Sequence, residues 1–222
     1  MHMEHKSTSD INDIISEIIH DVRELGQYIK VCIDRSVRSL EEQNTDMADR
    51  LIENKKKVSI LGDVIEDKCT QTMTLKISPI QLRTLKGILR IVIDLENIKN
   101  LSIDIAYITK ATSHSPHIKP LVDIPRMSVI LQEMLEGSLD ALEKRDAELA
   151  KKIAIRDDEI DALFDQIRRE LITYMIEDPK KITNASHLTF ASRYLERMGD
   201  HMINLCERVV YIVTGLKVDL NQ

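Results

Sequence analysis

The sequence has few of the residues that build turns and aromatic cores. Its 222 residues include no Trp, 3% aromatic residues, six Gly and five Pro. A core must therefore be filled by Ile, Leu, Val and Met. Because turn formers are scarce, the composition argues against many short strands and favours long helices. We predict an all-α protein.

An excess of positive charge is also missing. The formal net charge is -6, and the pI is near 5.7. Nucleic-acid binding requires a concentrated basic surface that neutralises phosphates, so we expect no nucleic-acid partner. The only basic run, residues 55–57, is typical of a solvated helix face.

Cysteines are few, and long apolar runs are absent. Cys32, Cys69 and Cys206 lie far apart among apolar neighbours, which fits small core residues in a reducing compartment rather than disulfides or a zinc site. No apolar run approaches the ~20 residues that a membrane span requires, and we see no signal segment. We therefore expect a soluble, cytoplasmic protein.

Apolar residues in the first half recur every three or four positions, which is the helical period. This pattern predicts helices over residues 10–42 and 47–73, and a third that starts at Pro79 and continues past Ile105. Proline is tolerated in the first turn of a helix, so Pro79 fits a helix start.

The second half repeats this plan after a break. Three of the five prolines lie within residues 111–125, where no helix is expected to continue. Helices are predicted over residues 126–144 and 146–177, and a last one opens at Pro179 and ends before Gly215.

Two segments one hundred residues apart read as copies of each other, DLENIKN at 94–100 and YLERMGD at 194–200. A repeat of this length fits a small helical domain. We therefore predict two tandem, pseudo-symmetric three-helix bundles with six long helices, at residues 1–112 and 126–222, joined by a linker at 113–125.

Acidic side chains on the last predicted helix form a stripe away from its apolar seam. Glu196 and Asp200 lie four residues apart and therefore on one face. Two such carboxylates repel each other by roughly 0.2–0.5 kcal/mol on an exposed helix unless they share a cation. This spacing indicates a candidate metal site.

A second acidic pair, Asp157 and Asp161, lies on the preceding predicted helix. If the two helices pack antiparallel, both pairs border one surface groove and present four or more oxygens to a hard or borderline cation. The alternative is two solvated acidic helix faces, because acidic pairs at this spacing also arise by chance.

The first copy differs at the positions that matter for a metal. Glu96 persists, but Asn100 stands where the second copy has Asp200, and Lys99 stands where it has Gly199. We expect weaker metal binding there, since a lysine repels a cation. Gly199 costs about 1 kcal/mol in a helix interior, which indicates close approach of a neighbouring helix or a ligand.

The last predicted helix carries the segment ASRYLERMGDH at 191–201, followed by Asn204, Glu207, Tyr211 and Gly215. This pattern resembles the second-repeat signature of the PhoU family of phosphate-uptake regulators. The segments IDALF at 160–164 and LITYMIEDP at 171–179 look like those that lead into the family's signature. Leu82-Arg83 followed by residues 94–96 looks like a degraded first-repeat counterpart.

This resemblance implies a pair of three-helix bundles that bind divalent or iron-type metal ions, including multinuclear clusters, at an acidic surface motif. Carried onto this sequence, it assigns Glu196 and Asp200 as the best ligands, Asp157 and Asp161 behind them, and Glu96 as a weaker one. It also implies a negative regulator that contacts the phosphate ABC transporter ATPase and a membrane sensor histidine kinase.

We accordingly expect a non-enzymatic, homodimeric regulator of phosphate uptake and phosphate signalling that reaches the membrane only through its partners. No nucleophile, phosphate-cradling glycine loop or dinucleotide fingerprint is present. Two alternatives stay open. One is a metal-storage protein or metalloenzyme on a helical bundle, and the other is a scaffold for another membrane transporter.

Overall fold

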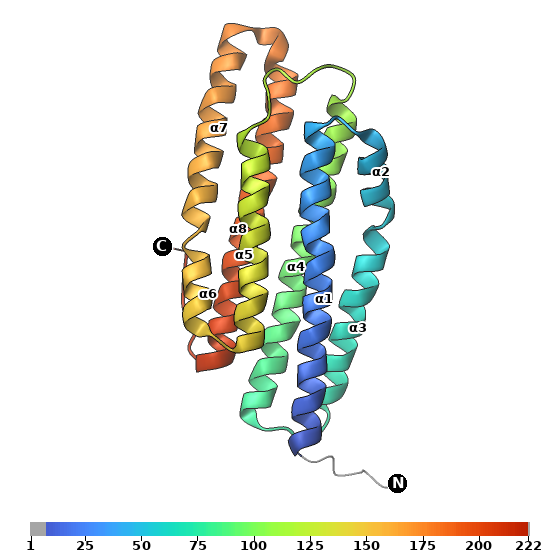
Figure 1. Ribbon diagram of the computed structural model, residues 1–222, viewed down its shortest axis with the longest axis vertical. Coiled ribbons are helices and arrows are strands. Elements are labelled where there is room, and N and C mark those ends of the chain that lie inside the picture. The colour runs from blue at the N-terminus through green and yellow to red at the C-terminus, as the bar shows by residue number, and fades with distance from the viewer. Residues whose placement is uncertain (1–7, 222) are drawn as a thin grey trace.

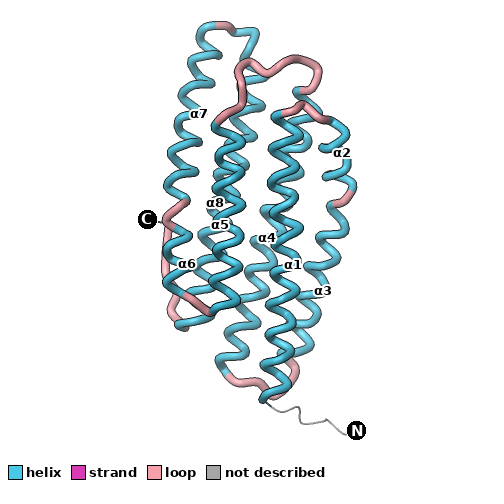
Figure 2. Tube along the Cα trace, in the orientation of Figure 1, coloured by secondary structure: helices cyan, strands magenta, loops and turns pink. Residues whose placement is uncertain are grey.

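A computed structural model describes residues 8–221, with side chains for residues 10–55 and 59–221. The chain forms an elongated bundle of roughly parallel and antiparallel helices (Figures 1 and 2). In chain order these are α1 (Thr8–Glu41), α2 (Thr45–Glu53), α3 (Lys55–Met73), α4 (Pro79–Thr112), α5 (Asp123–Lys144), α6 (Ala147–Ala154), α7 (Asp157–Glu177), the 3-10 helix η1 (Pro179–Lys181) and α8 (Ile182–Thr214).

The predicted all-α fold of two three-helix bundles is confirmed, but the middle helix of each bundle is interrupted. In the first bundle α2 stops at Asn54, whose side-chain amide donates to the Arg50 carbonyl at 2.7 Å. In the second bundle Ile155 and Arg156 separate α6 from α7. Both interruptions leave the two parts of the middle helix roughly in line (Figure 1).

The two bundles share one apolar core in which α4 packs along α8 and α1 along α5. Gly87 lets α4 approach α8 closely, since a Cβ there would overlap the side chain of Ile212. Arg83 closes the same end of this contact by donating from Nε to the Ile212 carbonyl at 3.1 Å, and Gly215 ends α8 with a φ of 80°. A guanidinium at the carboxyl end of a helix complements the helix dipole.

Local sequence accounts for the helix starts that matter here. Ser78 and Gln81 form a capping box in front of α4, and Pro79 occupies the first turn. Asp146 caps α6 through two backbone amides. The connector between the bundles is shorter than predicted, because α5 already begins at Asp123 and takes Pro125 into its first turn.

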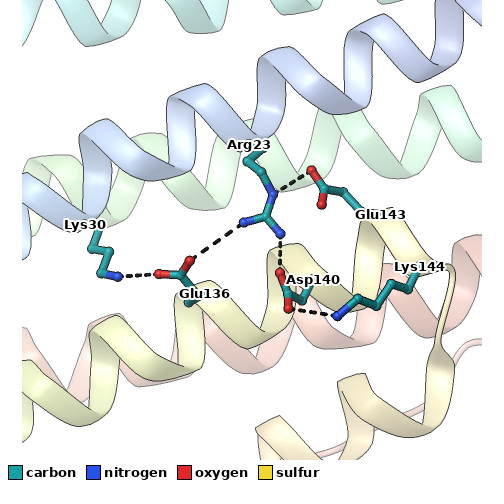
Figure 3. Close-up of polar contacts among 6 residues, drawn as sticks. All are labelled: Arg23, Lys30, Glu136, Asp140, Glu143 and Lys144. Atoms are coloured by element: carbon teal, nitrogen blue, oxygen red, sulfur yellow. Dashed lines mark hydrogen bonds and ion pairs between the residues drawn. The ribbon is translucent and has the colours of Figure 1, made fainter.

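A charged seam ties α1 to α5 across the two bundles (Figure 3). Arg23 of α1 forms ion pairs with three carboxylates of α5, those of Glu136, Asp140 and Glu143. Lys30 also pairs with Glu136. Among residues 8–221, no helix is both long enough and apolar enough to cross a membrane.

Candidate metal centre

The four predicted carboxylates of the second bundle lie together where α7 packs on α8. Asp157 stands in the first turn of α7 with Asp161 one turn later, and both face Glu196 and Asp200 of α8 closely enough to perturb one another's charge. Asp161 is exposed and Glu196 and Asp200 are partly exposed, so these three groups border the surface. The predicted convergence of the two acidic pairs is therefore seen, although Asp157 is more buried than an exposed stripe implies, at 5% exposure.

Gly199 explains how the two helices come so close. A Cβ at this position would overlap Asp157 Oδ1 and touch Ile160. Only a residue without a side chain lets the α7 carboxylate lie against the α8 backbone. The expectation that Gly199 serves close approach of a neighbouring helix is confirmed.

Burial and mutual repulsion shift the carboxyl groups of Asp157, Asp161 and Glu196 toward the protonated form. Burial, followed by the charges of Asp161, Asp200 and Glu196, raises the pKa of Asp157 to about 7. The pKa values of Asp161 and Glu196 are also raised, in each case first by burial and then by Asp200. The cluster concentrates negative charge that its surroundings compensate only in part.

Two oxygens of the cluster have no hydrogen-bond partner. Asp157 Oδ1 and Glu196 Oε2 are both buried and unsatisfied within the described part of the chain. The other Glu196 oxygen pairs with Arg193. A buried unsatisfied acceptor costs roughly 1–3 kcal/mol, more when charged, so a cation that binds here gains from oxygens that no described protein group satisfies. Carboxylates are the ligands that hard divalent ions and iron accept.

The side chains are not, however, arranged as a finished coordination sphere. Within residues 10–55 and 59–221, no three His, Cys, Asp or Glu side chains converge as ligands of one ion. The described geometry therefore supplies donors, charge and burial, and ligation requires rotation of the carboxylates about their side-chain bonds.

The corresponding place in the first bundle holds a lysine ammonium. Lys99, at the repeat position of Gly199, is 3% exposed and forms an ion pair with Glu96. Its Nζ also donates to Ser59 Oγ of α3 at 2.7 Å. Gly62 of α3 lies against Glu96, with a hypothetical Cβ 3.2 Å from Oε1. The first bundle thus neutralises its glutamate with a cation from its own chain.

One polar pair between the bundles was missed by the sequence analysis. His201 Nδ1 lies 2.9 Å from Asp94 Oδ1, which joins α8 to α4. No local pattern in the sequence places these residues together, because the contact depends on how the two bundles pack. Asp104 lies on the same helix as Asp94, and burial raises its pKa.

Two bundles that repeat one helical plan, with an acidic segment in each last helix, define a class of duplicated helical proteins. The family model described as the PhoU domain matches residues 22–109 and 124–209. The chain belongs to the PhoU family, as its resemblance predicted.

Relatives match along nearly the whole chain. A protein of Clostridium acetobutylicum is 32% identical over 219 residues, covering 96% of each chain, and one of Aquifex aeolicus is 34% identical over 202 residues, covering 90% and 91%. Both are named phosphate-specific transport system accessory protein PhoU homolog. The crystal structure of PhoU from Pseudomonas aeruginosa superimposes with a TM-score of 0.87 at 26% identity, covering 92% of this chain and 99% of that one. The family comprises accessory proteins rather than enzymes, which confirms the prediction of a non-enzyme.

Proposed function

We propose that the protein is a cytoplasmic accessory regulator of a phosphate transport system. The observation that supports this most directly is the match of both bundles to one family, with relatives that match over 90% or more of both chains and are named accessory proteins of such a system. Its proposed partners are the transporter ATPase and a membrane sensor histidine kinase, and its proposed effect on both is inhibitory. The proposed oligomeric state is a homodimer, which sedimentation of the purified chain measures.

The partner proposal is tested by pull-down with the ATPase subunit and, separately, with the kinase domain. The protein is expected to associate with the ATPase subunit or with the kinase domain. Deletion of its gene is expected to relieve inhibition of the transporter. A folded protein that binds neither, with or without added metal, would contradict the proposal. Association with a different membrane transporter instead would favour the scaffold alternative.

We further propose that the face between α7 and α8 binds divalent or iron-type cations, singly or as a cluster, through Glu196, Asp200, Asp157 and Asp161. The unsatisfied oxygens and the raised pKa values support this assignment. A bound cation would hold α7 against α8 and so shape the surface that partners contact. Glu96 contributes little, because Lys99 already neutralises it.

Elemental analysis of protein purified without added metal or chelator tests the site. Glu196→Ala/Asp200→Ala is expected to lose most of the metal. A matched control is Asp13→Ala/Glu17→Ala, which removes an exposed acidic pair with the same spacing from α1. Equal metal content in all three proteins would remove the site assignment and leave the family assignment unaffected.

A further inference from the structure

A pocket of about 360 Å³ opens in the first bundle beside the interruption between α2 and α3. Its walls come from α1, α2, the start of α3 and α4. Because α2 ends at Asn54, the middle helix does not cover this stretch of α1 and α4 as a continuous helix would. The volume falls at the lower end of the range of roughly 300–1,000 Å³ that small-molecule sites occupy.

The pocket is basic, although the protein is acidic. Four cationic residues line it, Arg35, Arg50, Lys55 and Lys99, and no Asp or Glu is among its described lining residues. The chain as a whole has 37 acidic and 31 basic residues. A concave surface with one sign of charge concentrates the opposite sign, so this pocket favours anions.

Two of these cations form no ion pair with a described residue, although Asp34 and Asp46 line an adjoining hollow beside them. Neither the Arg35 nor the Arg50 guanidinium has a hydrogen bond or ion pair with any described side chain, whereas Lys99 is committed to Glu96. Both arginines also border the adjoining hollow of about 560 Å³ between α1 and α2, which places them on the rim between the two spaces. A guanidinium presents parallel N–H donors that match the oxygens of a phosphate.

Apart from Asn54, the remaining residues that line the pocket are largely apolar. Tyr28 and Val31 are 58% and 44% exposed on α1, and Ile103 lies on the α4 side. Cys32 adds no competing charge, because burial raises the pKa of its thiol to about 11. An apolar surface beside two cationic donors suits a ligand with a phosphate at one end and a small ring or chain at the other.

We propose that this pocket binds a small phosphate monoester, with Arg35 and Arg50 holding the phosphate and Tyr28 and Val31 contacting the apolar body. Two unpaired arginines with Lys55 nearby fit a dianion better than a single carboxylate. This site is distinct from the acidic face of the second bundle and requires no metal. Its ligand would bias the packing of α2 on α1 and α4.

Calorimetric titration of the full chain with phenyl phosphate, inorganic phosphate and phenol tests the proposal. Phenyl phosphate is expected to saturate and to bind more tightly than either of its halves. Arg35→Gln and Arg50→Gln are each expected to weaken it about tenfold or more, the equivalent of one charge-assisted hydrogen bond. Arg168→Gln, an exposed arginine of α7, is the matched control and is expected to bind as the unaltered protein does.

Tyr28→Ser separates the two parts of the ligand. It is expected to weaken phenyl phosphate and to leave inorganic phosphate unchanged. The proposal is overturned if millimolar phenyl phosphate does not saturate, if phenol binds equally well, or if the two pocket variants, folded by circular dichroism, bind as Arg168→Gln does. Because the readout is ligand binding alone, its failure leaves the regulatory proposal standing.

Discussion

Replacing Asp157 by Asn tests whether the acidic face is strained when no metal is bound. Asp157 is 5% exposed, and its pKa is raised to about 7 from 3.8. The folded state therefore favours the protonated acid. The corresponding stability is complete below about pH 4 and is lost as the pH rises through about 7. Asn is neutral at every pH and keeps the shape of the side chain.

The magnitude follows from the size of the shift. A rise of about three pKa units corresponds to about 4 kcal/mol. The neighbouring carboxylates can rearrange when one of the charges is removed, so we expect a net change of about 2–4 kcal/mol in the free energy of unfolding. The metal-free Asp157→Asn protein should equal the unaltered protein near pH 4 and exceed its stability by that amount at pH 8.

Urea unfolding of chelator-treated protein across this pH range measures the effect. Asp158→Asn is the control, because Asp158 is an exposed neighbour in the same helical turn. Saturating divalent metal should then stabilise the unaltered protein at pH 8 more than it stabilises Asp157→Asn, since a cation favours the ionised carboxylate. Parallel pH profiles for the unaltered protein and Asp157→Asn would refute the reasoning.

Three further substitutions probe the same architecture. Gly199→Ala should destabilise by about 1–2 kcal/mol, since overpacking against Asp157 outweighs a gain of roughly 1 kcal/mol in helix propensity, and should reduce metal content; thermal unfolding and elemental analysis measure both. Lys99→Met should cost about 2 kcal/mol in urea unfolding, because it leaves the partly buried Glu96 without its counter-charge, and a loss below 1 kcal/mol would contradict that role. Arg23→Met should cost about 1 kcal/mol at low salt and less in high salt, because its three partners on α5 are partly exposed; equal loss at both salt concentrations would argue against an electrostatic seam.

The apolar periodicity of the sequence predicted where the helical segments lie, because these segments pack apolar residues into the shared core. The start at Pro79 and the end before Gly215 follow from local backbone chemistry, and both are confirmed. The interruptions at Asn54 and Arg156 were not predicted, because the apolar repeat continues across them and neither Pro nor Gly marks the break. The apolar pattern predicts which face of a helix is buried, but it does not predict whether the helix is continuous.

The candidate site was predictable only in part, for a related reason. The spacing of Glu196 and Asp200 placed them on one face, but the burial of Asp157 depends on how α7 packs against α8. Lys99 was expected only to repel a cation, whereas its ammonium in fact pairs with Glu96. Contacts between helices such as that of Asp94 with His201 have no local signal in the sequence.

Lys99, which pairs with Glu96 in the first bundle, makes the two duplicated bundles chemically different. Under the proposed function, a chelator can strip a bound ion from the second bundle, but it cannot remove the lysine side chain that is covalently part of the first. Loss of the metal would then destabilise only the carboxyl-terminal bundle, and the stability of the amino-terminal bundle would stay unchanged. In such a protein, the difference in stability between the two bundles would depend on the concentration of available metal ions.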